Sequence, residues 1–151
     1  MPQNASFAPV ALLMFLSGIG IPILAAFNAG LGEQLGSPPA ATFVLFAVGL
    51  ALAALIVAFT GLPPRSAFTV ERPHLYFGAA FMLFYALSVT WAAPRIGVGN
   101  AVFFVLLGQL IAAATIDHFG LWGTLKAEIT ARRLAGIGIM AFGVYLARKP
   151  V

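Results

Sequence analysis

Long apolar runs without a charge are the feature that most limits how this chain can fold. Residues 7–31 and 40–61 contain no Asp, Glu, Lys or Arg. About 20 consecutive apolar residues cross the roughly 30 Å hydrocarbon core of a bilayer as one helix. A helix also pairs the backbone polar groups internally, which the bilayer requires. The runs therefore predict an integral membrane protein.

Composition supports this prediction. Charged residues make up 8% of the chain and apolar residues 62%, whereas soluble domains have roughly 25% charged and 45–50% apolar residues. The mean hydropathy is +1.03. The 151 residues leave no room for a separate soluble domain, so residues 1–151 are expected to form one transmembrane domain. The net charge of +4 is scattered, which favours contact with the membrane surface over nucleic acid. The absence of cysteine excludes disulfides and thiolate chemistry.

Five transmembrane helices are predicted, which makes the fold class all-α and polytopic. They cover about residues 7–31, 40–61, 75–93, 96–116 and 134–147. The last has only 14 residues, about 21 Å of helix. It can still span if the flanking arginine and lysine side chains reach both interfaces.

Five crossings place the two ends of the chain on opposite sides of the membrane. The positive-inside rule compares Lys and Arg on the two sides. The side of the N-terminus has five: Arg65, Arg72, Lys126, Arg132 and Arg133. The other has three: Arg95, Arg148 and Lys149. This small excess favours a cytoplasmic N-terminus and leaves insertion in both orientations, a dual topology, open.

The first predicted helix contains polar and small residues in its apolar run. At 100° per residue, Ser17 and Asn28 fall within about 20° of each other, with Ala25 near the same stripe. Pro22 cannot donate to the carbonyl of Gly18, which predicts a kink. The stripe is interpreted either as close helix packing or as the lining of a cavity.

Other uncharged polar residues in the spans are candidate solute contacts. Gln109 forms either an interhelical hydrogen bond or a solute contact, and Tyr85 lies in the middle of the third span. Tyr76 and Trp91 are interpreted as interface anchors.

In the fifth predicted helix, two glycines seven residues apart suit helix pairing across a dimer. Gly136 and Gly143 lie on one face, two turns apart. Chance spacing in so short a segment produces such a pattern too.

The stretch "GQLIAAATIDHFG" ends in Asp117 and His118. Adjacent Asp and His residues fit a metal site, an acid–base pair, a proton carrier or gate, or simply the polar end of a helix. A metal would need further ligands, and the chain has one other histidine, His74. No metal and no cofactor are expected. The preferred interpretation is an interfacial gate or proton-handling group, to which Glu33 is added.

The connector after this stretch is predicted to contain an interfacial helical turn. Leu125 and Ile129 would share a face, and Glu128 would pair with Arg132 at i,i+4. In one conformation only, Asp117 is expected to pair with a basic residue such as Arg72 or Lys126.

Two segments make the sequence similar to a known family. The segment "GIGIPILAAFNAGLGEQLGSPPAATFVLFAVGLALA" resembles the first half of the YdcZ-like family of the drug/metabolite transporter superfamily, and "GQLIAAATIDHFGLWG" resembles its second half. The pattern covers nearly the whole chain. The family-like residues are Pro22, Asn28, Gly36, Pro38, Gly49, Gly108, Gln109, Asp117, His118, Gly120 and Gly136.

The resemblance implies a five-helix inner-membrane protein of bacterial type. It would be half of the ten-helix superfamily fold, completed by an antiparallel pair like the small multidrug transporters. Those transporters carry a carboxylate in the middle of the first helix, whereas here Glu33 comes only near the helix end. This difference argues against proton-coupled cation antiport by that route.

The favoured function is a dimeric membrane transporter with a midplane cavity. Asn28, Gln109, Tyr85 and Ser17 would line the cavity and contact a small organic solute, neutral or zwitterionic. The expected partners are this solute, membrane lipid and a second copy of the chain, and not nucleic acid. The alternative is a non-transporting accessory subunit of a larger membrane complex. An enzyme is not expected.

Overall fold

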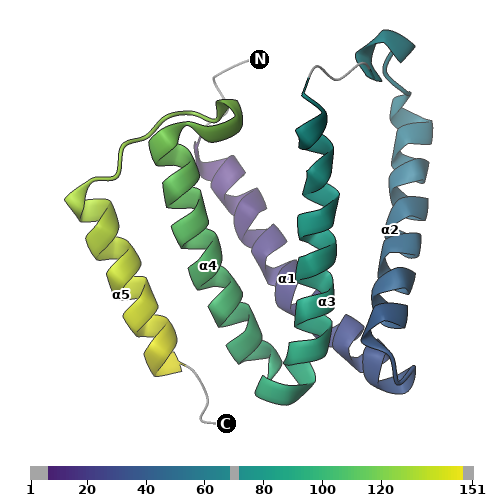
Figure 1. Ribbon diagram of the computed structural model, residues 1–151, viewed down its shortest axis with the longest axis horizontal. Helices are drawn as coiled ribbons and strands as arrows, with labels where there is room; N and C mark the ends of the chain where they lie inside the picture. Colours follow the sequence, from purple (N-terminus) through teal and green to yellow (C-terminus); the bar gives the residue numbers. More distant parts are fainter. Residues whose placement is uncertain (1–6, 69–71, 148–151) are drawn as a thin grey trace. The chain divides into compact units, whose positions relative to one another are not determined.

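The computed structural model describes residues 7–68 and 72–147, and within them the protein is all-α (Figure 1). The α-helices are α1 (Phe7–Gln34), α2 (Pro38–Thr60), α3 (Gly78–Ile96), α4 (Val98–Phe119) and α5 (Ala131–Ala147). Three short 3₁₀ segments are η1 (Arg65–Phe68), η2 (Pro73–Phe77) and η3 (Leu121–Gly123). The prediction of an all-α chain is confirmed.

Four of these helical segments are long and apolar enough to cross a bilayer. They are α1, α2, α4 and the continuous segment Pro73–Ile96, which joins η2 to α3. The chain is therefore a multi-pass membrane protein. The fifth helix, α5, has 17 residues, about 25 Å of helix. It is longer than the 14-residue segment predicted because it begins at Ala131.

Several helices extend beyond their predicted ends. The third continues through Pro94 to Ile96, although Pro94 has no N–H to donate to the carbonyl of Thr90. The fourth continues to Phe119 and ends where Gly120 adopts a left-handed conformation at φ 60°, which glycine tolerates. Asp117 and His118 therefore lie inside the last turn of α4. Similarly, α1 runs through Pro22 without a break, and its kink stays a prediction.

The connector before α5 differs from its prediction. Residues 124–130 are not helical, so the expected interfacial turn is wrong. Residues four apart face each other only on a helix. Because Glu128 lies outside α5, the expected pairing of Glu128 with Arg132 loses its geometric basis. Thr130 instead caps α5, because its hydroxyl accepts the N–H of Arg133 at 3.2 Å.

The chain packs as two compact units, Met1–Arg95 and Ile96–Val151. The first contains α1, α2 and all but the last residue of α3, and the second contains α4 and α5.

In the first unit, α1 and α2 are joined by a tight turn. Gly36 has φ +60°, and Ser37 caps α2 by accepting the N–H of Ala40 at 3.3 Å. Pro38 follows as the first residue of α2, where its fixed φ suits a helix and its missing N–H costs nothing. These residues fix the end of α1 against the start of α2.

The interior of the first unit is built from small side chains. A Cβ added to Gly32 would lie 3.0 Å from the Thr90 methyl group and 3.8 Å from the Ala41 Cβ. Buried small residues continue the contact: Ala25, Ala29, Ala41, Ala86 and Ala93. Most bulky apolar side chains are exposed instead, as expected of a surface that meets lipid or other helices. Small residues thus bring polar groups on α1 and α3 within hydrogen-bonding distance.

Candidate functional site

Asn28 on α1 and Thr90 on α3 form a buried polar contact in the first unit. They are only 5% and 2% exposed. The Asn28 Nδ2 donates to the Thr90 Oγ1 at 2.5 Å, and this Oγ1 donates to the Ala86 carbonyl at 2.7 Å. Asn28 is a predicted site residue, whereas Thr90 was not predicted.

This chain of hydrogen bonds fixes the orientation of the Asn28 amide. The Thr90 hydroxyl has one proton, which goes to Ala86, so its oxygen can only accept from Asn28. The amide nitrogen therefore points at Thr90. The Asn28 Oδ1 has no hydrogen-bond partner among the described residues, and this oxygen keeps some exposed surface. A free acceptor is thus held in place.

Asn28 lies on the wall of an open groove between α1 and α2. The groove has a volume of about 430 Å³, within the size range of small-molecule sites. Its lining residues are Gly20, Ile23, Leu24, Phe27, Asn28, Leu31, Val44, Leu45 and Val48. The only polar side chain among them is that of Asn28. The groove can therefore hold an apolar body beside one polar side chain.

A second cavity of the same unit lies at the ends of α1 and α3. It has a volume of about 350 Å³, and its lining residues are Gly32, Glu33, Pro38, Thr90, Pro94 and Arg95. Thr90 thus contacts Asn28 and also lines this cavity. The Arg95 Nη1 donates to the Trp91 carbonyl, and its guanidinium carbon lies 4.3 Å from the centroid of the Trp91 ring.

Two hydroxyl groups are buried without a hydrogen bond. The Thr42 Oγ1 and the Tyr85 Oη have no partner among the described residues. Thr42 also lines an apolar groove of about 420 Å³ between α2 and α3. Tyr85 was predicted to contact solute, but it lines none of these three cavities.

The other predicted solute contacts are Ser17 in the first unit and Gln109 in the second. Ser17 is exposed, and its hydroxyl donates to the Leu13 carbonyl at 2.9 Å. Gln109 is exposed on α4, in the second unit, and its side chain has no hydrogen bond within the described part of the chain. Ser17 is therefore not among the residues that line the groove beside Asn28, and the solute contact of Gln109 stays a prediction.

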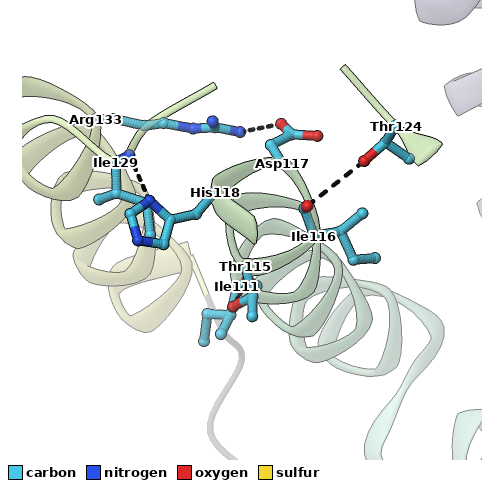
Figure 2. Close-up of polar contacts among 8 residues, drawn as sticks. All are labelled: Ile111, Thr115, Ile116, Asp117, His118, Thr124, Ile129 and Arg133. Atoms are coloured by element: carbon cyan, nitrogen blue, oxygen red, sulfur yellow. Dashed lines mark hydrogen bonds and ion pairs between the residues drawn. The ribbon is translucent and has the colours of Figure 1, made fainter. Parts of the chain in front are cut away.

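In the second unit, Asp117 and His118 hold the connector that leads from α4 to α5 (Figure 2). The Arg133 Nη2 lies 2.6 Å from the Asp117 Oδ2. The His118 Nδ1 accepts the N–H of Ile129 at 3.2 Å, and the Asp117 carbonyl accepts that of Ala127 at 2.8 Å. The two residues thus fasten the connector and the first turn of α5 to the end of α4.

The ion-pair partner of Asp117 differs from the residues expected. The expected partner is a basic residue such as Arg72 or Lys126, whereas the structure pairs Asp117 with Arg133. Arg133 lies on the same predicted side of the membrane as Arg72 and Lys126. This shared side is the signal in the sequence that points to Arg133 as a partner of Asp117. Among the described residues, no group of three His, Asp or Glu side chains could hold a metal ion.

The glycines proposed for dimer packing lie on an exposed part of α5. A Cβ added to Gly136 or Gly143 would have no neighbour within 4 Å. The structure thus leaves this face open, and the dimer contact stays a prediction.

Comparison with protein families matches residues 9–146 to the family described as "Putative inner membrane exporter, YdcZ". No curated protein and no solved structure matches the chain.

Proposed function

This chain belongs to the YdcZ family, and on that premise we propose that it exports a small organic solute across the bacterial inner membrane. Asn28 carries the proposal. Its side chain is buried on a membrane helix, its amide nitrogen donates a hydrogen bond to Thr90, and the residue lines an apolar groove. Polar groups at such positions are expensive in lipid and mark solute pathways by default.

The transporter acts as a homodimer in this proposal. Five helices, with α5 as the fifth span, are few to enclose a path for a solute. Two copies in opposite orientations would form the inverted repeat of many secondary transporters, with the solute near the midplane. The exposed Gln109 would then face the shared cavity, and Gly136 and Gly143 would pack between the copies.

Asp117 and His118 form a gate in this proposal and catalyse no reaction. Their contacts with Arg133 and Ile129 hold α5 and the connector before it against α4. Breaking these contacts would release the connector. Glu33, at the far end of α1, belongs to a second gate. The accessory-subunit alternative would require a larger complex that co-purifies with the chain.

The test compares solutes released by living cells. Cells expressing the chain, its Asn28→Leu variant or the control Thr60→Val are grown in parallel, and their media are compared by mass spectrometry. Thr60 is exposed, and its hydroxyl donates to its own helix at Ile56. We expect at least one solute that depends on the chain and on Asn28 but not on Thr60.

Two controls make this comparison decisive. Gel filtration in mild detergent measures the folded protein of each variant, and the conservative Asn28→Gln replaces Asn28→Leu if the latter does not fold. Export that is unaffected by a folded Asn28 variant would refute this site.

Orientation is tested by single-cysteine labelling, since the chain has no cysteine. The residue replaced is Lys149, which lies outside the described residues. An impermeant thiol reagent applied to intact cells should label about half of the molecules if both orientations exist. Labelling of nearly all or none would refute the antiparallel homodimer.

A further inference from the structure

The cavity at the ends of α1 and α3 contains an acid and a base that do not pair with each other. Glu33 and Arg95 both line it, yet the ion pair of the described residues joins Asp117 to Arg133. The Glu33 carboxylate has no hydrogen bond among the described residues. Opposite charges that share a small cavity without meeting leave room for a ligand that carries both.

Pro94 on α3 removes one backbone donor beside the cavity, which favours a further acceptor there. Pro94 lines the cavity and has no N–H for the carbonyl of Thr90, four residues earlier. A carbonyl released by proline inside a membrane helix needs another donor. Together with the Glu33 carboxylate, it suits an ammonium group, which has three N–H donors and no acceptor.

The basic side of the cavity is held in place by an aromatic ring. Arg95 packs on Trp91 and donates one N–H to its carbonyl. A guanidinium has five N–H groups, so four remain. A planar guanidinium suits a carboxylate or phosphate because it can donate two parallel hydrogen bonds.

We propose that this cavity binds a small zwitterion, with its ammonium group at Glu33 and its anionic group at Arg95. The inference rests on the proposed function in one respect: Thr90 joins this cavity to Asn28, so the zwitterion is the solute waiting to enter the groove. The same chemistry has two sources, a dissolved amino acid or the headgroup of phosphatidylethanolamine.

The test measures binding to purified protein through thermal stabilisation, because a ligand that binds the folded state raises the unfolding temperature. Three probes share one branched apolar body. Leucine carries both charges, 3-methylbutylamine lacks the carboxylate, and 4-methylpentanoate lacks the amine. We expect leucine to bind at least about tenfold more tightly than either, as the loss of one charge-assisted contact implies.

Matched variants assign the binding to the cavity. Glu33→Gln and Arg95→Gln should each weaken leucine binding about tenfold, whereas Glu128→Gln, which removes an exposed carboxylate of the second unit, should leave it unchanged. If Arg95→Gln does not fold, Glu33→Gln decides, since the Glu33 side chain is exposed and has no hydrogen bond to lose within the described residues.

A lipid arm separates the two sources. The protein is placed in phosphatidylcholine nanodiscs with and without phosphatidylethanolamine. If phosphatidylethanolamine stabilises the protein through Glu33 and Arg95 and leucine does not, the ligand is the lipid headgroup. If leucine binds, the ligand is the dissolved zwitterion. Absence of both, or equal binding of leucine and 3-methylbutylamine, would overturn the proposal.

Binding is measured where nothing is transported, so the two proposals fail separately. A protein that binds leucine but exports no solute refutes the transport function alone. A protein that exports an Asn28-dependent solute but binds neither zwitterion refutes the role of this cavity alone.

Discussion

The Arg133 Nη2 lies 2.6 Å from the Asp117 Oδ2 and joins the first turn of α5 to the last turn of α4 (Figure 2). The partners are separated by 16 positions in the sequence. Their side chains are 33% and 36% exposed, so water and salt reach the pair. It therefore orients the two helices more than it stabilises them.

Replacing Arg133 by Gln should lower the free energy of unfolding by about 0.2 to 1 kcal/mol, the range of exposed ion pairs. Arg132→Gln is the matched control, because Arg132 is exposed and the ion pair is made by its neighbour. Unfolding in mixed micelles measures both variants. The difference between them should shrink in 1 M salt, which screens exposed charges, and equal losses would contradict the assignment.

Asp117→Asn should change the rate of export several-fold while the free energy of unfolding falls by no more than about 1 kcal/mol. The neutral amide keeps the shape of the carboxylate and loses the charge that holds Arg133. Export of the solute identified in the medium is compared with unfolding in detergent. If folded protein and export decline in parallel, Asp117 has a structural role instead of a gating one.

Acidification should free the N–H of Ile129. The His118 Nδ1 accepts this N–H at 3.2 Å, whereas a protonated imidazole carries hydrogen on both nitrogens and cannot accept. The contact therefore exists only with neutral His118 and is lost when the ring is protonated.

Hydrogen exchange at Ile129, corrected for the intrinsic pH dependence of exchange, measures this loss. The N–H of Leu134, which is bonded to the Thr130 carbonyl at 3.0 Å, is the internal control. In His118→Phe, exchange at Ile129 should be fast at every pH. Unchanged protection in the acidified wild type would rule out the switch.

Gly32→Ala should lower the free energy of unfolding by about 1 to 3 kcal/mol, as overpacking does. The added Cβ would lie 3.0 Å from the Thr90 methyl group, so this methyl group would have to shift by a few tenths of an ångström in a buried contact. Gly30→Ala is the control on the same helix, because its Cβ would meet nothing within 4 Å. The prediction fails if both substitutions have the same effect in mixed micelles.

The sequence predicted the helices better than their ends. Apolar runs near 20 residues identify spans because the bilayer sets their length. The third helix was expected to stop before Pro94, since proline lacks a donor and usually ends a helix, yet the helix runs on to Ile96. Local rules could not predict this, because Pro94 lines a cavity that only the fold creates.

The site was predicted in part for a similar reason. An asparagine in an apolar run is conspicuous, so Asn28 was found. Thr90 was missed because a threonine in a helix normally bonds to its own backbone, as Thr60 and Thr115 do. Thr90 does this as well, and its second role as an acceptor depends on the contact between α1 and α3. Arg133 was missed because the path of residues 124–130 cannot be derived from local patterns.

The tight turn at Gly36 and Ser37 has a mechanical consequence. Because α1 and α2 are fastened at this corner, it serves as a pivot from which α2 extends as a lever about 34 Å long. A rotation of α2 by about 5° would move its far end by about 3 Å, whereas Asn28, which lies on α1, would not move with it. Asn28 can thus keep its position while the far end of α2 moves. Spectroscopic labels near Thr60, at that end of α2, would report the largest displacement.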